Sequence, residues 1–158
     1  MQNMKPKEVE QSIKEITEIV KKSELVKMDE FATIMISEGF TRRTEYEKAI
    51  QRLSQYYQAN PTTSDNEVLH SRIVKNINQW IKDSVDKGDF IAALKVHNEY
   101  IGSWLKTSQR IDTSYFIGRA FEQAGASAEA EKTYADVFKK LVNMRGTKSE
   151  KERSIFEK

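Results

Sequence analysis

The chain has 158 residues, of which 32% are charged and 38% are hydrophobic, and its formal net charge is +2. This near balance of charge gives no overall electrostatic case for binding nucleic acid or an anionic membrane. Cysteine is absent, which excludes disulfides, thiolate metal ligands and a thiol nucleophile. Because the sequence shows neither a signal-type leader nor an apolar run long enough to span a bilayer, we expect a cytoplasmic protein.

The first segment, residues 1–23, is predicted to be an amphipathic helix with a narrow apolar stripe. Its apolar residues recur at spacings of three and four, which places them on one side of a helix: Val9, Ile13, Ile16 and Val20. We expect this helix to pack on the helices that follow it. The alternative is a helix that docks on a partner, since a stripe this narrow is also typical of coiled coils.

A pair of helices is predicted next. The first begins near Ser23 and is expected to end at Gly39, because glycine often terminates a helix. Thr41 is expected to cap the second, which ends before Pro61. The side chains expected in the core are Leu25, Met28, Phe31, Ala32, Met35 and Ile36 in the first helix, and Tyr46, Ala49, Ile50, Leu53 and Tyr56 or Tyr57 in the second.

Two further pairs of helices follow the polar segment after Pro61. Ser64 and Glu67 have the spacing of a capping box for a long helix that runs to about Lys87. Gly88 is expected to end this helix and Asp89 to start its partner. The last pair turns at Gly125, after which Ser127 is expected to cap the final helix. The expected core residues are Val68, Leu69, Ile73, Val74, Ile77, Trp80, Ile81 and Val85; then Phe90, Ala93, Leu94, His97, Tyr100, Ile101 and Trp104; then Ile117, Gly118, Phe121 and Ala124; and finally Ala130, Tyr134, Val137, Phe138 and Leu141.

Small and aromatic residues occupy corresponding positions in the three pairs, which resemble tetratricopeptide repeats. The third pair matches best, through Gly118, Phe121, Gly125, Ala130 and Tyr134. The second pair offers Trp80, Gly88, Phe90 and Ala93, but has Ile81 at the small-residue position and His97 at the aromatic one; the first offers Phe40, Tyr46, Ala49 and Pro61, with Thr44 in place of the turn glycine.

The resemblance implies an all-α fold, in which about three degenerate hairpins form a right-handed superhelical stack with capping helices at both ends. We therefore predict an N-terminal helix over residues 1–23 and a repeat domain over 24–144, with units at about 30–63, 74–107 and 111–144. Residues 145–158 form a charged tail.

In repeats of this family the first helix of each pair lines a concave groove that holds a peptide or helix of a partner protein. Helical periodicity places Lys75, Asn78 and Lys82 on one such face, and Tyr115, Arg119 and Glu122 on the corresponding face of the next unit, with Ile34 and Glu38 from the first unit. These six residues, from Lys75 to Glu122, are the predicted partner-binding site. The lysines, the arginine and the tyrosine suit an acidic peptide that carries one apolar side chain.

No catalytic or phosphate-binding motif is found, and we expect neither an enzyme nor a bound cofactor or metal. His97 is expected to be a packed core residue. The predicted function is a non-enzymatic protein–protein interaction module, such as an adaptor, an assembly subunit or a chaperone-like protein. One alternative is a self-associating structural protein that uses the N-terminal helix, or Ile155 and Phe156 of the tail. A weaker alternative is a nucleic-acid-binding helical repeat.

Overall fold

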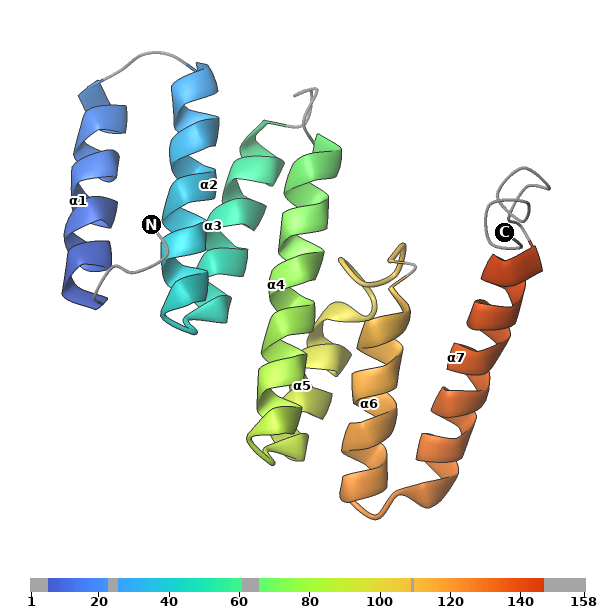
Figure 1. The fold of residues 1–158 in the computed structure, drawn as a ribbon. Helices are drawn as coiled ribbons and strands as arrows, with labels where there is room; N and C mark the ends of the chain where they lie inside the picture. Colours follow the sequence, from blue (N-terminus) through green and yellow to red (C-terminus); the bar gives the residue numbers. More distant parts are fainter. Residues whose placement is uncertain (1–5, 23–25, 61–65, 109, 147–158) are drawn as a thin grey trace, which may run out of the picture. The chain divides into compact units, whose positions relative to one another are not determined.

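The computed structural model describes residues 6–22, 26–60, 66–108 and 110–146, and within these ranges it contains helices and no strand (Figure 1). The predicted all-α class is therefore confirmed. The helices are α1 (Pro6–Lys22), α2 (Val26–Arg42), α3 (Tyr46–Ala59), α4 (Asn66–Asp86), α5 (Phe90–Tyr100), α6 (Ile111–Gln123) and α7 (Ser127–Gly146). None of these described helices is both long and apolar enough to cross a membrane. Leu25, Ser64 and the tail residues Ile155 and Phe156 lie outside the described ranges.

The chain divides into two compact units, one up to Trp80 and the other from Ile81, and α4 contributes residues to both. In the first unit α1 packs on α2, and α2 packs on α3. The buried apolar side chains of this unit come from all four helices: Val9, Ala32, Ile36, Tyr46, Ala49, Ile50, Leu53, Tyr56, Leu69, Ile73, Val74 and Ile77.

Gly39 does not end α2, as the sequence predicted, but lies within it. A Cβ atom added at Gly39 would come within 2.8 Å of Cδ1 of Ile13, so the glycine allows α1 to approach α2 closely. α2 continues through Arg42. Thr41 is consequently part of the last turn of α2, and Glu45, which makes no side-chain capping bond, precedes α3.

The side of α2 that is buried also differs from the prediction. Phe31 and Met28 are 65% and 43% exposed, whereas the polar residues Thr33 and Ser37 are buried beside Ala32 and Ile36. The Ser37 hydroxyl is buried with its proton donated to the Ile34 carbonyl, one turn earlier, which a count of apolar residues misses. The Thr33 hydroxyl is buried without a hydrogen-bond partner among the described residues. Val68 in α4 was likewise expected in the core and is exposed.

Three hairpin turns share one backbone conformation. Thr44, Gly88 and Gly125 have left-handed φ angles of 60°, 78° and 79°. In each turn the next residue donates its N–H to the carbonyl five residues earlier: Glu45 to Phe40 (2.9 Å), Asp89 to Ser84 (2.8 Å) and Ala126 to Phe121 (2.9 Å). This is the Schellman arrangement of a helix end. Thr44 thus takes the conformation for which the other two turns use glycine.

The second unit packs α5 on α6 and α6 on α7. Its buried apolar residues are Ile81, Val85, Ala93, Val96, Leu105, Ile117, Ala120, Ala130 and Val137. Gly118 lies against the Tyr134 ring, where an added Cβ would approach Cε1 to 2.5 Å. Ala49, Ala93 and Ala130, each five residues after one of the three left-handed residues, are all buried.

Four core predictions in this unit are wrong. α5 ends at Tyr100 and residues 101–107 form turns, which leaves Ile101 exposed and buries Leu105 instead. Ala124 is exposed because it ends α6. Phe138 and Leu141 are 67% and 47% exposed, since the described part of the second unit has only α6 packed against α7. Trp104 and His97 are half-buried, and burial lowers the pKa of His97.

Candidate partner-binding groove

A polar groove lies between α2 and α4 in the first unit. It consists of two adjoining hollows of about 300 and 530 Å³, and Glu38, Arg72 and Lys75 line both of them. The remaining lining residues are Ser37, Thr41, Tyr46, Asn76 and Gln79 in one hollow, and Glu67, Val68 and Ser71 in the other. We call this feature the α2–α4 groove.

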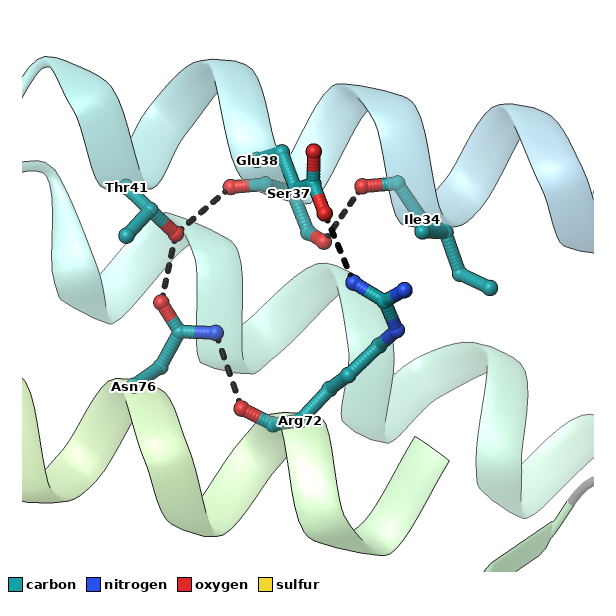
Figure 2. Close-up of polar contacts among 6 residues, drawn as sticks. All are labelled: Ile34, Ser37, Glu38, Thr41, Arg72 and Asn76. Atoms are coloured by element: carbon teal, nitrogen blue, oxygen red, sulfur yellow. Dashed lines mark hydrogen bonds and ion pairs between the residues drawn. The ribbon is translucent and has the colours of Figure 1, made fainter. Parts of the chain in front are cut away.

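The floor of the α2–α4 groove contains the polar side chains of Ser37 and Asn76, which are buried, and of Thr41, which is half-buried (Figure 2). These side chains hydrogen-bond to the protein itself. The Ser37 hydroxyl donates to the Ile34 carbonyl (2.8 Å), and the Asn76 amide donates to the Arg72 carbonyl (2.9 Å). The single Thr41 hydroxyl proton lies between two acceptors, the Ser37 carbonyl at 2.9 Å and Oδ1 of Asn76 at 2.5 Å. The bond between Thr41 and Asn76 joins α2 to α4, whereas the other bonds lie within one helix. Together they use the hydroxyl protons of Ser37 and Thr41 and one N–H of Asn76.

The rim of the α2–α4 groove carries the charges. Arg72 reaches from α4 to Glu38 on α2, with 2.7 Å between Nη1 and Oε1 (Figure 2). Lys75, one turn further along α4, is exposed and makes no ion pair with any described residue. The ammonium group of Lys75 is therefore free to receive an anion.

One wall is aromatic. Tyr46 is buried at the start of α3 and stacks on Trp80, with ring centroids 6.4 Å apart and an angle of 26° between the planes. Trp80 is half-buried rather than fully in the core. Stacking of this kind fixes the side of the groove without adding a charge.

Two of the predicted site residues, Lys75 and Asn78, belong to the compact unit that ends at Trp80. Lys75 lies in the α2–α4 groove, and Asn78 does not line it. Asn78 is only 6% exposed, because it lies one turn after the buried Val74 on the core side of α4. Glu38 lies in the groove as expected. Sequence reasoning missed Arg72, Asn76 and Gln79, although a spacing of three and four residues from Lys75 could have identified Arg72 and Gln79 as its neighbours.

The predicted residues of the second unit form two clusters. In the first, Lys82 and Arg119 both contact Asp86, at 2.5 Å and 3.5 Å. The hydrogen bond between Lys82 and Asp86 raises the pKa of Lys82 and lowers that of Asp86. Lys82 also lies 5.9 Å from the centre of the Phe116 ring. Asp86 thus partly neutralises both predicted cations. The spacing of four residues between Lys82 and Asp86 is typical of an ion pair on a helix, whereas the contact with Arg119 joins two helices.

The second cluster contains Tyr115, Glu122 and Tyr134. The Tyr134 hydroxyl donates to Oε2 of Glu122 (2.8 Å), and the rings of Tyr115 and Tyr134 are 6.3 Å apart. Burial, reinforced by the bond to Glu122, raises the pKa of Tyr134 to about 12. Tyr115 is 46% exposed and remains available to a partner, whereas the acceptor capacity of Glu122 is partly used.

No family model, curated protein or solved structure matches this chain. The part of the chain that the structure describes also contains no group of three or more His, Asp or Glu side chains that could hold a metal ion. What the α2–α4 groove can do chemically is bind: it offers two cations, Arg72 and Lys75, two carboxylates, Glu38 and Glu67, and an aromatic wall.

Proposed function

We propose that the chain is a non-enzymatic protein–protein interaction module, a degenerate tetratricopeptide-like stack that binds an acidic segment of a partner in the α2–α4 groove. The repeat character is supported by the three left-handed turns and by the buried alanine that follows each. Equivalent turns followed by equivalent packing alanines are what repeated helical hairpins require.

The observation that carries the proposal is the α2–α4 groove itself. Arg72 and the unpaired Lys75, which line both hollows, favour a ligand that bears a carboxylate. A peptide laid between two helices also meets the apolar surface of Tyr46. The predicted cluster at Lys82 and Arg119 is a weaker site for an acid, because Asp86 already contacts both cations.

The test places a photo-crosslinking amino acid at Ser71, an exposed position in the α2–α4 groove, and at Lys95, an exposed position in α5. Crosslinking in lysate of the source cells should capture a partner from position 71 and not from position 95. The captured segment is then synthesised and its affinity measured by isothermal titration calorimetry.

The Lys75→Glu variant should bind that segment at least about tenfold more weakly, because an attractive charge becomes a repulsive one. Lys95→Glu is the matched control and should bind as the wild type does. Equal capture from both positions, or equal loss of affinity in both variants, would refute binding in the α2–α4 groove.

A second candidate function, self-association, is favoured by one specific observation on α7. Phe138, Leu141 and Val142 lie within about one turn of one another and are each about half exposed or more. The N-terminal stripe considered for this role is partly covered by α2, with Val9 buried and Ile13 against Gly39. α7 is therefore the surface that we propose for a second copy, because three of its apolar side chains are exposed close together.

Charge along α7 suits an antiparallel second copy. Three acids and one lysine precede Phe138, and the next two residues are lysines. Two antiparallel α7 helices would therefore bring an acidic half against a basic half. Sedimentation over a range of concentrations should show a dimer that Phe138→Glu abolishes and Ile91→Glu, a change at an exposed apolar residue of α5, leaves intact. A monomer at every concentration would remove this candidate.

A further inference from the structure

We propose that Arg72 is the main anion-binding residue of the α2–α4 groove and that Glu38 competes with the partner for it. The carboxylate of Glu38 then occupies, in the free protein, the place that an acidic side chain of the partner takes when it binds. This inference rests on the proposed function. It adds that Arg72 sets the preference for acidic partners and that Glu38 weakens their binding.

Hydrogen bonds within the protein already use several donors of the α2–α4 groove. In the floor, the Ser37 hydroxyl and the Asn76 amide each donate to a main-chain carbonyl, and the one proton of Thr41 has two acceptors within reach. A hydroxyl has a single proton to donate. The positively charged donors of the groove lie on the rim, in Arg72 and Lys75. A carboxylate binds more strongly to a charged donor than to a neutral hydroxyl or amide.

The two cations of the groove lie close together on α4. Arg72 and Lys75 are three residues apart on α4, a spacing that places them on one face of a helix, and both line both hollows. A guanidinium presents five N–H donors in a planar fork that matches a carboxylate, whereas an ammonium acts as a compact point charge. Arg72 is thus the better partner for a carboxylate, and Lys75 adds attraction beside it.

Arg72 forms an ion pair with Glu38, with 2.7 Å between Nη1 and Oε1, and the two side chains are 36% and 42% exposed. Ion pairs this exposed contribute little to stability and exchange readily, because water solvates both charges. Glu38 is tethered beside Arg72 by the fold, so it competes at a high effective concentration without holding Arg72 tightly.

A competitor of this kind lowers the apparent affinity for the ligand, which equals the intrinsic affinity multiplied by the fraction of time that Arg72 is unoccupied. If Glu38 occupies Arg72 for about two thirds to nine tenths of the time, its removal tightens binding about three- to tenfold. Glu38→Gln removes the charge and keeps nearly the same size and an oxygen acceptor. It is therefore the variant that separates competition from packing.

The probe is a fluorescein-labelled hexaglutamate peptide with an amidated C-terminus, titrated against the full chain by fluorescence anisotropy at low salt. Glu38→Gln should bind the peptide about three- to tenfold more tightly than the wild type. Glu47→Gln is the control, because Glu47 is exposed on α3, outside the groove, and its loss changes the net charge equally. Circular dichroism should show the same helix content in all variants.

Arg72→Gln provides the second arm. It should weaken binding, and adding Glu38→Gln to it should restore no more affinity than Glu47→Gln does. A gain from Glu38→Gln that equals the control, or that persists without Arg72, overturns the proposal, as does an absence of peptide binding by both the wild type and Glu38→Gln. If crosslinking at Ser71 still captures a partner in those cases, the proposed function stands and only the role of Arg72 and Glu38 falls.

Discussion

Replacing Gly118 by alanine tests whether α6 and α7 pack as closely as the structure shows. The new Cβ would lie 2.5 Å from Cε1, 2.8 Å from Cδ1 and 3.1 Å from Cζ of Tyr134, so the ring must move. The ring is held by the bond from its hydroxyl to Glu122. Overpacking of this kind lowers the free energy of unfolding by about 1–3 kcal/mol, while replacing a helical glycine raises it by about 1 kcal/mol. We expect a net loss of about 1 kcal/mol.

The two contributions separate in a double-mutant cycle with Tyr134→Ala. Without the ring, Gly118→Ala should raise the free energy of unfolding by up to about 1 kcal/mol, because only the helix preference of alanine remains. The coupling between the two sites should therefore be about 2 kcal/mol. Urea unfolding followed by far-ultraviolet circular dichroism measures all four proteins. A coupling below about 0.5 kcal/mol, the limit expected of independent sites, would refute the close approach of α7 to Gly118.

Two further substitutions and a change of pH should alter the stability of the protein in predictable directions. Thr44→Gly should raise the free energy of unfolding by about 1 kcal/mol, because a β-branched residue is strained at a φ of 60°; thermal unfolding measures it, and Thr44→Ala should not match it. Thr33→Val should also raise the melting temperature, since the Thr33 hydroxyl is buried without a hydrogen-bond partner among the described residues; a lower value would contradict this. The folded pKa of Tyr134 is raised from 10.0 to about 12, so its contribution to stability is complete below pH 10 and is lost as the pH rises towards 12. Urea midpoints measured across this range should fall more steeply for the wild type than for Tyr134→Phe.

Much of the fold follows from the spacing of apolar residues. The stripe of α3 was predicted residue by residue from Tyr46 to Leu53, with the last position left between Tyr56, which is buried, and Tyr57. The turn glycines at Gly88 and Gly125 marked two hairpins. Asp89 was expected to start α5, and its carboxylate accepts the N–H of Ala92 at 3.0 Å. These features are local, so the sequence around each is enough to predict it.

The errors arise where distant segments decide the outcome. Gly39 has the signature of a helix end, and only the approach of Ile13 from α1 explains why glycine is needed inside α2. Phe138 has the helical period of a core residue, yet it is exposed, because α6 is the described helix that packs against α7 and it does not cover Phe138.

The candidate site was harder to predict than the fold. Lys75 and Glu38 were identified from periodicity, because exposed faces follow the same period as buried ones. Arg72 was missed, since its importance comes from the ion pair with Glu38, a residue 34 positions away in the sequence. Lys82 and Arg119 were predicted as site cations without regard to Asp86, although Asp86 lies four residues after Lys82, a spacing typical of an ion pair on a helix. The contact of Arg119 with Asp86 joins α6 to α4 and is not indicated by a local pattern.

The row of Phe138, Leu141 and Val142 also makes α7 a useful starting point for protein engineering. A designed helical hairpin fused after Gly146 would find apolar side chains already in place to pack against, so α7 would need no redesign. A short helix with a polar outer face, fused at the same point, would instead cover the row and improve solubility at high concentration. The same three residues thus allow the chain to be either lengthened or closed.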